Sequence, residues 1–294
     1  MLDYHVHLWP HASRAEPAEQ RLEHLSSLCD VASSRGVAEI ALTEHLFRFV
    51  EARKLLDGAL EDVIGQPLEP AMAAYFAHHA TASLESYVEA VLEARREGLP
   101  IRLGLEVDYY PGRMAEVARL LEGYPFDVLL GSVHWLGSWM FDVLEDPLEL
   151  LEWDRLGAEV AWRRYTEALV ELAATRTCDV LAHPDLVKLT GRRPPAALVE
   201  ELEARIAEAV ARSGMSAEIS SAGWRKPCGE AYPSVSLLGR LFALGVPVTT
   251  ASDSHGPHDV ADRAPELVVL ARAAGYRHLR AFSERMPRDV LLPS

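Results

Sequence analysis

The chain has 294 residues, of which 49% are hydrophobic, so it can bury a large core and is neither a disordered protein nor a disulfide-stapled mini-protein. Its formal charge is −15, from 44 acidic and 29 basic residues, which argues against a nucleic-acid-binding protein that relies on phosphate contacts. A small phosphorylated substrate is compatible with this charge where bound metal ions reverse the local field.

Seven short apolar runs alternate with stretches of helical periodicity. The runs are LDYHVHL (2–8), VAEIALTEH (37–45), IRLGLEVD (101–108), FDVLLGSVH (126–134), CDVLAHPD (178–185), MSAEISSAG (215–223) and VPVTTASDSH (246–255). Helices are expected near 17–35, 83–97, 112–122, 148–175, 195–213, 234–244 and 260–273. This alternation predicts parallel βαβ units in an α/β fold, either a doubly wound sheet or a barrel. No Pro/Gly/Ser linker divides the chain, so we expect one domain over 1–294, with the irregular segment 46–80 as a possible excursion after the second strand.

The first predicted strand carries an unusual set of polar side chains, in DYHVHLWPH. In an extended strand Asp3, His5 and His7 point to one face, which is a familiar arrangement of metal ligands. A surface strand with scattered histidines, or the remnant of a tag, explains this segment equally well.

The other predicted strands also end in residues that bind metals. They are Glu44 and His45, Glu106 and Asp108, His134, His183 and Asp185, Glu218, and Asp253 and His255. In parallel α/β barrels the carboxyl ends of the strands converge on the active site. A lone His134 or His183 could be a buried core histidine, and Glu106 could pair with an arginine, but one metal site explains all the positions together. The set is large enough for two or three divalent ions. Imidazole and carboxylate without thiolate suit Zn, Mn or Fe.

The motifs DYHVH, LTEH, GLEVDYYPG, GSVHW, AHPDLVK and SDSH, in this order, resemble those of the polymerase-and-histidinol-phosphatase (PHP) superfamily. The resemblance runs from residue 1 to about 260. It implies a distorted seven-stranded (βα)7 TIM-like barrel with a centre of two or three metal ions.

The resemblance also implies a ligand set. One ion would be held by His5, His7, Glu106 and Asp253, and Glu106 would bridge to a second ion at His134 and His183. A third ion would use His11, His45 and His255, with His24 as a substitute if His11 fails. Asp3 is expected to orient a ligand histidine. The off-strand residues His78, His79 and His258 receive no role.

Two further stretches, AEISSAGWRKPCGEAYPS (217–234) and YRHLRAFSERMPRDV (276–290), are similar to the histidinol-phosphatase branch. Arg225 and Lys226 then become candidates for binding the substrate phosphate, the alternative being a solvated pair in a surface loop. Glu218 is a candidate for a substrate ammonium group, an orienting group or a metal ligand.

The expected function is hydrolysis of a phosphate monoester, with L-histidinol phosphate as the first choice of substrate. A hydroxide bridging two ions would attack phosphorus, and Asp253 is the candidate proton donor, acting through water. Three alternatives stay open: a PHP phosphoesterase acting on a sugar phosphate, nucleotide or phosphotyrosine, an amidohydrolase-type metal barrel, and a non-catalytic metal-binding module. The second usually bridges its metals with a lysine, whereas this chain offers Glu106.

The chain contains no apolar run that approaches the roughly 18 residues of a membrane span, and no secretory signal is evident at its start. Cys29, Cys178 and Cys228 are odd in number and far apart, which favours a reducing compartment. We expect a cytoplasmic protein without membrane or nucleic-acid partners, and the sequence leaves its oligomeric state open.

Overall fold

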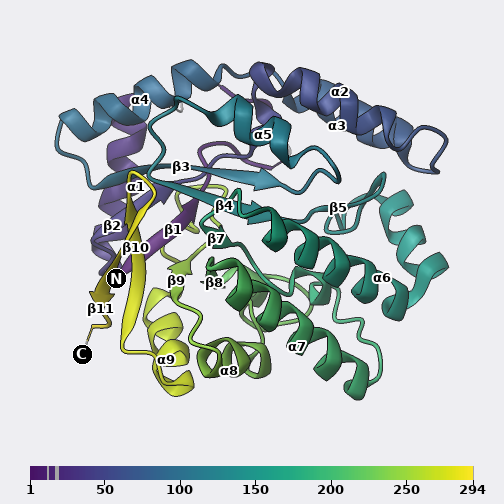
Figure 1. Cartoon of the computed structure of the whole chain (residues 1–294). Coiled ribbons are helices and arrows are strands. Elements are labelled where there is room, and N and C mark those ends of the chain that lie inside the picture. Colours follow the sequence, from purple (N-terminus) through teal and green to yellow (C-terminus); the bar gives the residue numbers. More distant parts are fainter. Residues whose placement is uncertain (12, 17–19, 294) are drawn as a thin grey trace.

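Seven parallel strands form a barrel in the computed structural model, which describes residues 1–11, 13–16 and 20–293 (Figure 1). Their order around the sheet is β1-β2-β3-β4-β7-β8-β9. The strands are β1 (Leu2–Val6), β2 (Glu39–Leu42), β3 (Ile101–Asp108), β4 (Val128–Ser132), β7 (Val180–Leu181), β8 (Ser216–Ser220) and β9 (Val248–Ala251). The expected α/β barrel is therefore confirmed.

The barrel closes where β1 meets the residues that follow β9. Val6 and Ser254 form a parallel bridge, and the His7 amide donates to the Ser254 carbonyl at 2.8 Å. Further down, the Thr250 hydroxyl donates to the Leu2 carbonyl at 2.7 Å. Closure brings the first and last predicted ligand segments side by side, although about 250 residues separate them in the sequence.

Strand burial explains why the apolar runs are nearly continuous. All five residues of β4 are buried, as are seven of the eight residues of β3, because helices cover the outside and side chains fill the inside. Gly104 in β3 permits a close approach to β2, since a Cβ there would lie 2.7 Å from Thr43 Cγ2 and 3.0 Å from the Leu42 carbonyl oxygen.

The expected helices between the strands form with small shifts of their ends. They are α1 (Leu22–Ser34), α4 (Leu84–Arg96), α5 (Met114–Leu121), α6 (Pro147–Thr175), α7 (Ala196–Ser213), α8 (Val235–Ala243) and α9 (Ala264–Ala274). Side-chain caps fix the first turn of several helices. Asp146 caps α6 by accepting from the Leu148 amide at 2.8 Å, and Pro147 occupies the first helical position.

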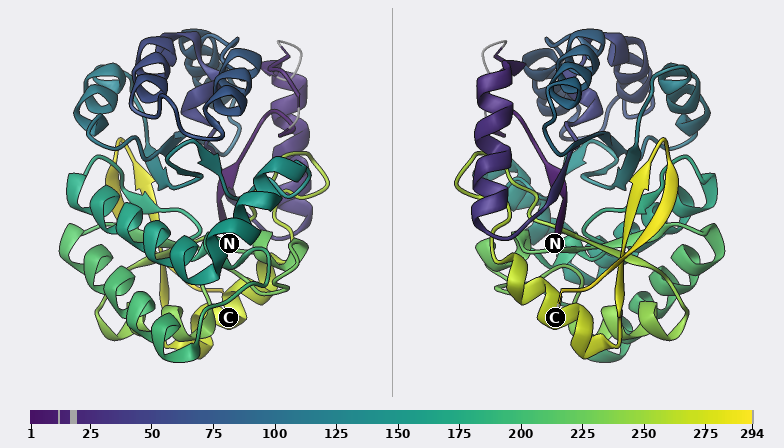
Figure 2. Two further views of the ribbon diagram at one scale, coloured as in Figure 1. Left: turned by 90° about the vertical axis from the view of Figure 1, so that its right-hand side faces the viewer. Right: turned by 90° about the vertical axis from the view of Figure 1, so that its left-hand side faces the viewer.

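The segment 46–80 is not irregular as expected, because it contains α2 (Arg53–Glu61) and α3 (Glu69–His79). The alanine-rich run AMAAYFA gives α3 a high helix propensity. The strands run toward the right of Figure 1, so the left view of Figure 2 looks onto their carboxyl ends. Here α2 and α3 lie beside the mouth of the barrel, together with β5 (Trp135–Leu136), β6 (Trp139–Met140) and the first turns of α6.

The opposite mouth carries a hairpin of β10 (His278–Ser283) and β11 (Met286–Leu291), which the sequence did not predict (Figure 2, right). The Phe282 amide donates to the Tyr4 hydroxyl at 3.1 Å, and the Glu284 amide donates to Asp127 Oδ1 at 3.0 Å. Arg285 pairs with Asp179 at 2.9 Å. The hairpin thus stabilises the end of the barrel that lies away from the predicted ligands.

Among the described residues, no helix combines the length and the apolar character needed to cross a bilayer.

Candidate metal centre

All nine predicted metal ligands gather at the carboxyl ends of the strands. Two of them, His5 and Glu106, are within β1 and β3, and the others follow strands: His7 and His11 after β1, His45 after β2, His134 after β4, His183 after β7, and Asp253 and His255 after β9. His5, His7, His45, Glu106 and His183 have 2% exposure or less. Such burial is costly for ionisable groups unless they have partners or a ligand.

Glu106 lies at the centre of the cluster, with imidazoles around both of its oxygens. Its Oε2 lies 2.7 Å from His45 Nδ1, 3.3 Å from His5 Nε2 and 3.5 Å from His7 Nε2. Its Oε1 lies 3.0 Å from His183 Nε2 and 3.5 Å from His134 Nε2. One carboxylate is therefore shared by five histidines from four strand ends, as a bridging ligand would be.

A second set of imidazoles stacks around His7 and His255. Ring centroids are 4.1 Å apart for both His7–His255 and His11–His255, and 4.2 Å apart for His7–His45. The Nε2 atoms of His255 and His45 lie 3.4 Å apart. Asp253 Oδ1 joins the two sets, at 3.5 Å from His7 Nε2 and 3.7 Å from His255 Nδ1.

Carboxylates behind the cluster fix the orientation of individual rings. Glu218 Oε2 lies 2.7 Å from His5 Nδ1, and Asp108 Oδ1 lies 2.7 Å from His134 Nδ1. Glu44 lies 3.4 Å from His7 Nδ1 and accepts from the backbone amides of Leu8, Trp9 and His45. Such partners set the tautomer and direction of metal-binding histidines.

Electrostatics favour the metal-binding forms of both carboxylates and of three imidazoles, whereas nearby carboxylates, acting against the effect of burial, raise the pKa of His5, His7 and His134. Burial opposes ionisation of Glu106, but the surrounding histidines, His45 and His5 foremost, hold its pKa well below the usual range. The same balance, with His5 the main partner, lowers the pKa of Asp253. Burial lowers the pKa of His45 to about 4 and also lowers the pKa of His11 and His255. These imidazoles are therefore neutral, as metal ligation requires.

The unsatisfied atoms of the cluster fit a bound cation. Within the described residues, no hydrogen bond reaches His5 Nε2, His7 Nε2, His45 Nδ1, His183 Nδ1 or Glu106 Oε2, although all five are buried. Three sets of side chains hold donor atoms within 4.8 Å of one another: His7/His45/His255, His5/His7/Glu106 and His45/Glu106/His134. The chain thus presents a candidate divalent-metal site built from imidazole and carboxylate donors.

The remaining predicted residues lie in different surroundings. Arg225 donates to the backbone carbonyls of Ser252 and Asp253 at 2.8 and 3.0 Å and pairs with Asp262 at 3.1 Å, so it braces the loop after β9. Lys226 instead lines the cavity beside the cluster. Glu218 is fully buried, and its two oxygens are engaged by His5 and the His183 amide, which suits an orienting group better than a substrate contact.

The sequence predicts that Asp3 orients a ligand histidine, but its carboxylate has other partners. Its carboxylate accepts from the amide and hydroxyl of Ser252, at 2.7 and 2.6 Å, and from the Ala261 amide at 2.7 Å. It therefore ties β1 to the segment that carries Asp253. His24, the expected substitute for His11, lies in α1 and belongs to none of the three donor sets found in the described part of the chain.

A cavity of about 620 Å³ opens beside the cluster at His11 and Lys226. Its walls come from α3, from the β5–β6 hairpin and from the segment that leads into α6. The lining residues are His11, Ala71, Tyr75, His79, Trp135, Met140, Asp142, Val143, Glu145, Asp146, Glu149 and Lys226. Sequence patterns assigned no role to His79, Asp142 or Glu149, because none of them lies at the end of a barrel strand.

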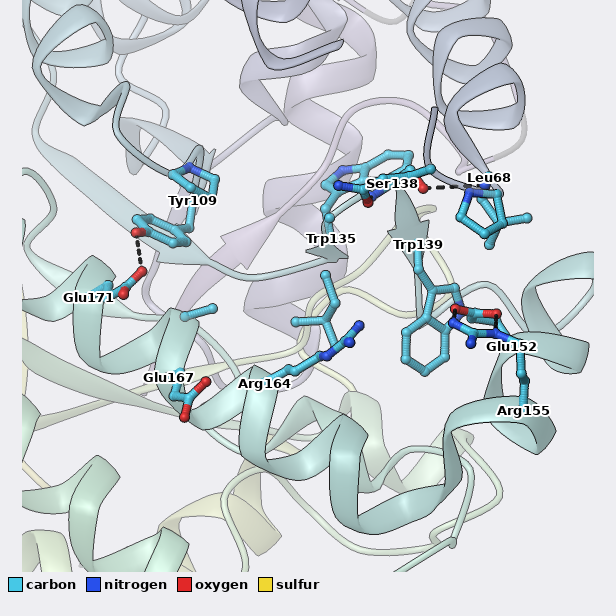
Figure 3. Close-up of a pocket in the computed structure, with 16 residues that line it drawn as sticks. Leu68, Tyr109, Trp135, Ser138, Trp139, Glu152, Arg155, Arg164, Glu167 and Glu171 are labelled. Carbon is cyan, nitrogen blue, oxygen red and sulfur yellow. Dashed lines mark hydrogen bonds and ion pairs between the residues drawn. The ribbon is translucent and has the colours of Figure 1, made fainter. Parts of the chain in front are cut away.

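A separate groove of about 520 Å³ lies between Tyr109, the β5–β6 hairpin and α6 (Figure 3). Tyr109 donates to Glu171 at 2.6 Å, and Arg155 pairs with Glu152. None of the predicted site residues lines this groove. It shares Trp135 with the cavity, so the indole forms part of the wall between them.

Comparison with known proteins shows which family this chain belongs to. The PHP domain family matches residues 3–222, three quarters of the chain. The chain belongs to the PHP domain family. A relative from Deinococcus radiodurans named "Probable histidinol-phosphatase" is 38% identical over 191 residues, which cover 65% of this chain and 71% of the relative. A relative of the same name from Schizosaccharomyces pombe is 26% identical over 236 residues, covering 69% and 77%.

Two solved structures share the fold of this PHP domain protein. Histidinol phosphate phosphatase from Lactococcus lactis, complexed with Zn, L-histidinol and phosphate, has a TM-score of 0.66 at 20% identity and covers 98% of both chains. A structure from Listeria monocytogenes has a TM-score of 0.68 at 18% identity, covering 90% of this chain and 99% of that one. The expected PHP-type barrel and family are thus confirmed.

Proposed function

We propose that this protein is a metal-dependent phosphate monoesterase that converts L-histidinol phosphate and water into L-histidinol and phosphate. The position of Glu106 carries the proposal, because one buried carboxylate shared by five imidazoles is suited to holding adjacent cations. Family membership and the 38% identical relative support the choice of substrate. The central Glu106 also separates this site from the lysine-bridged centre of an amidohydrolase.

Two or three divalent ions would occupy the centre, held by the nine residues named above. The donor chemistry suits Zn, Mn or Fe, and the three overlapping donor sets support more than one ion. Bound ions would activate a water molecule at neutral pH and neutralise charge on the phosphoryl oxygens. Glu218, Asp108 and Glu44 would keep the ligand imidazoles in the required direction.

Three residues near the metal centre would contribute to phosphate binding, loop position and proton transfer. Lys226 would contact the phosphate as a point charge, while Arg225 would hold the Asp253 loop in place. Asp253 is ionised, because the nearby histidines hold its pKa low against the effect of burial. It would therefore first take the proton of the attacking water and then pass it, through water, to the leaving alkoxide.

Phosphate release from a panel of esters tests this function. L-Histidinol phosphate, sugar phosphates, mononucleotides and phosphotyrosine are supplied to the protein as purified, after chelation, and after addition of Zn or Mn. We expect the highest kcat/KM for histidinol phosphate, loss on chelation and recovery with metal. A clear preference for another ester would overturn the substrate assignment but would still support the proposed phosphatase activity. Absence of turnover in every metal state would favour a non-catalytic module.

A further inference from the structure

One wall of the cavity beside the metal centre is unusually acidic. Asp142, Glu145, Asp146 and Glu149 follow β6 and enter the first turn of α6, and all four line the cavity. In the described part of the chain, none of these carboxylates forms an ion pair within 4.0 Å. No arginine, lysine or histidine in the described part of the chain therefore neutralises this wall by direct contact.

Glu149 and Asp142 each have one carboxyl oxygen that is buried and that no hydrogen bond reaches within the described residues. Glu149 is only 3% exposed, and its Oε2 has no partner among the described residues. Oδ1 of Asp142 is likewise buried and unpartnered. A buried carboxylate oxygen without a hydrogen-bond partner is energetically costly. In native proteins such an atom is therefore usually bound by another protein group, by water or by a ligand. The described residues provide no hydrogen-bond partner for these two oxygens.

The ionised forms of both groups would gain from a nearby cation. Burial, reinforced by Asp146 and Asp142, raises the pKa of Glu149 to about 8. Burial also raises the pKa of Asp142, although His134 and Lys226 partly oppose the shift. A positively charged ligand at this wall would stabilise the carboxylates and would itself be neutralised in a partly dry cavity.

The rest of the cavity has the chemistry expected around an organic cation. Its apolar surface comes from Ala71, Tyr75, Trp135, Met140 and Val143. The rings of Tyr75 and Trp135 meet edge to face at 5.6 Å. His11 and Lys226 line the cavity too, next to the candidate metal ligands, so the cavity combines an anion-binding end with an acidic wall. Its volume of about 620 Å³ suits a small-molecule substrate.

We propose that Asp142 and Glu149 form a cation-binding subsite for the alcohol portion of the substrate. The site would then select phosphate monoesters of alcohols that carry a protonated amine or imidazole. Esters of neutral or anionic alcohols would be disfavoured, because they leave the carboxylates unpaired. This inference rests on the proposed phosphatase function and adds specificity-determining residues to it.

The first test compares a cationic and an uncharged ester. The ratio of kcat/KM for L-histidinol phosphate to that for phenyl phosphate is measured in the metal-loaded wild type, Asp142→Asn, Glu149→Gln and the double variant. Both substitutions keep side-chain size and remove charge. We expect the ratio to fall at least about tenfold in each single variant, mainly through KM for the cationic ester. The control is Glu167→Gln, an exposed carboxylate of the separate groove, which should keep the wild-type ratio.

The second test does not depend on turnover. Isothermal titration calorimetry of the metal-loaded protein with L-histidinol, and with uncharged 2-phenylethanol, measures recognition of the alcohol alone. We expect L-histidinol to bind more tightly and to lose at least about tenfold in affinity in Glu149→Gln. If the ratio and the affinity are unchanged in the variants, the subsite is overturned while the phosphatase function stands. If no ester is hydrolysed but charge-dependent binding of L-histidinol persists, the proposed function fails and the subsite stands.

Discussion

Glu106 Oε2 and His45 Nδ1 lie 2.7 Å apart, although β2 and β3 supply them separately. His45 lies three residues after the last residue of β2 and forms an isolated bridge with Glu106, so the backbone pairing of the barrel sets their separation. The same carboxylate reaches His183 at 3.0 Å on its other oxygen. Glu106 therefore contacts ligand histidines from both sides of the barrel sheet order, and its position depends on the pairing of several strands.

Substitution Glu106→Gln should reduce kcat for histidinol phosphate by more than about 1000-fold, because the shared anionic ligand is lost. The protein should keep its barrel, since Gln has nearly the same size, and circular dichroism checks this. Metal content, measured by mass spectrometry of the washed protein, should fall with activity. Glu171→Gln, in the separate groove, is the matched control. Full activity and metal content in Glu106→Gln would remove the basis of the proposed centre.

Substitution Glu218→Gln tests whether this buried carboxylate orients His5 or contacts substrate. An orienting role predicts a loss of metal affinity of about 10- to 100-fold, because His5 loses its charged partner at 2.7 Å. Excess metal should then restore much of the activity, with KM close to that of the wild type. A raised KM that saturating metal does not correct would instead indicate substrate contact.

Arg225 and Lys226 are neighbours in the sequence but should give different kinetic defects. Lys226→Ala should raise KM for phosphate esters by about tenfold, because the cavity loses its lysine. Arg225→Ala should lower kcat and metal affinity, since its guanidinium braces the carbonyls of Ser252 and Asp253. Steady-state kinetics at saturating metal separates the two, and the opposite pattern would reverse the assigned roles.

The strand-end histidines could be predicted because parallel strands share one direction, so every run that ends in a ligand points to the same mouth. The two-residue period of a strand was enough to predict that His5 and His7 share one face. Glu106 could be predicted as a ligand because it comes at the end of an apolar run. The acidic wall could not be found in this way. Asp142 and Glu149 follow a short hairpin, and only the packing of this hairpin against α3 and α6 brings them beside His11. The partners of Asp3 and Arg225 were also missed, since side-chain contacts to distant backbone amides and carbonyls leave no periodic pattern.

Glu149 should make the stability of the protein depend on pH. Its pKa is about 8 in the folded protein, against 4.5 when exposed, so the unfolded chain loses this proton first as pH rises. Its contribution to the free energy of unfolding should therefore fall between pH 4.5 and 8. The full pKa difference corresponds to about 4 kcal/mol between pH 5 and pH 8.5, and solvent screening at the open cavity reduces this value. Relative to wild type, the unfolding free energy of Glu149→Gln should therefore rise by about 2 kcal/mol from pH 5 to pH 8.5. Urea denaturation at the two pH values, without substrate and in the same metal state, measures this difference, and Glu167→Gln controls for the loss of one negative charge. A difference that stays constant with pH would mean that Glu149 is already ionised in the folded protein, with a cation or water satisfying its buried oxygen.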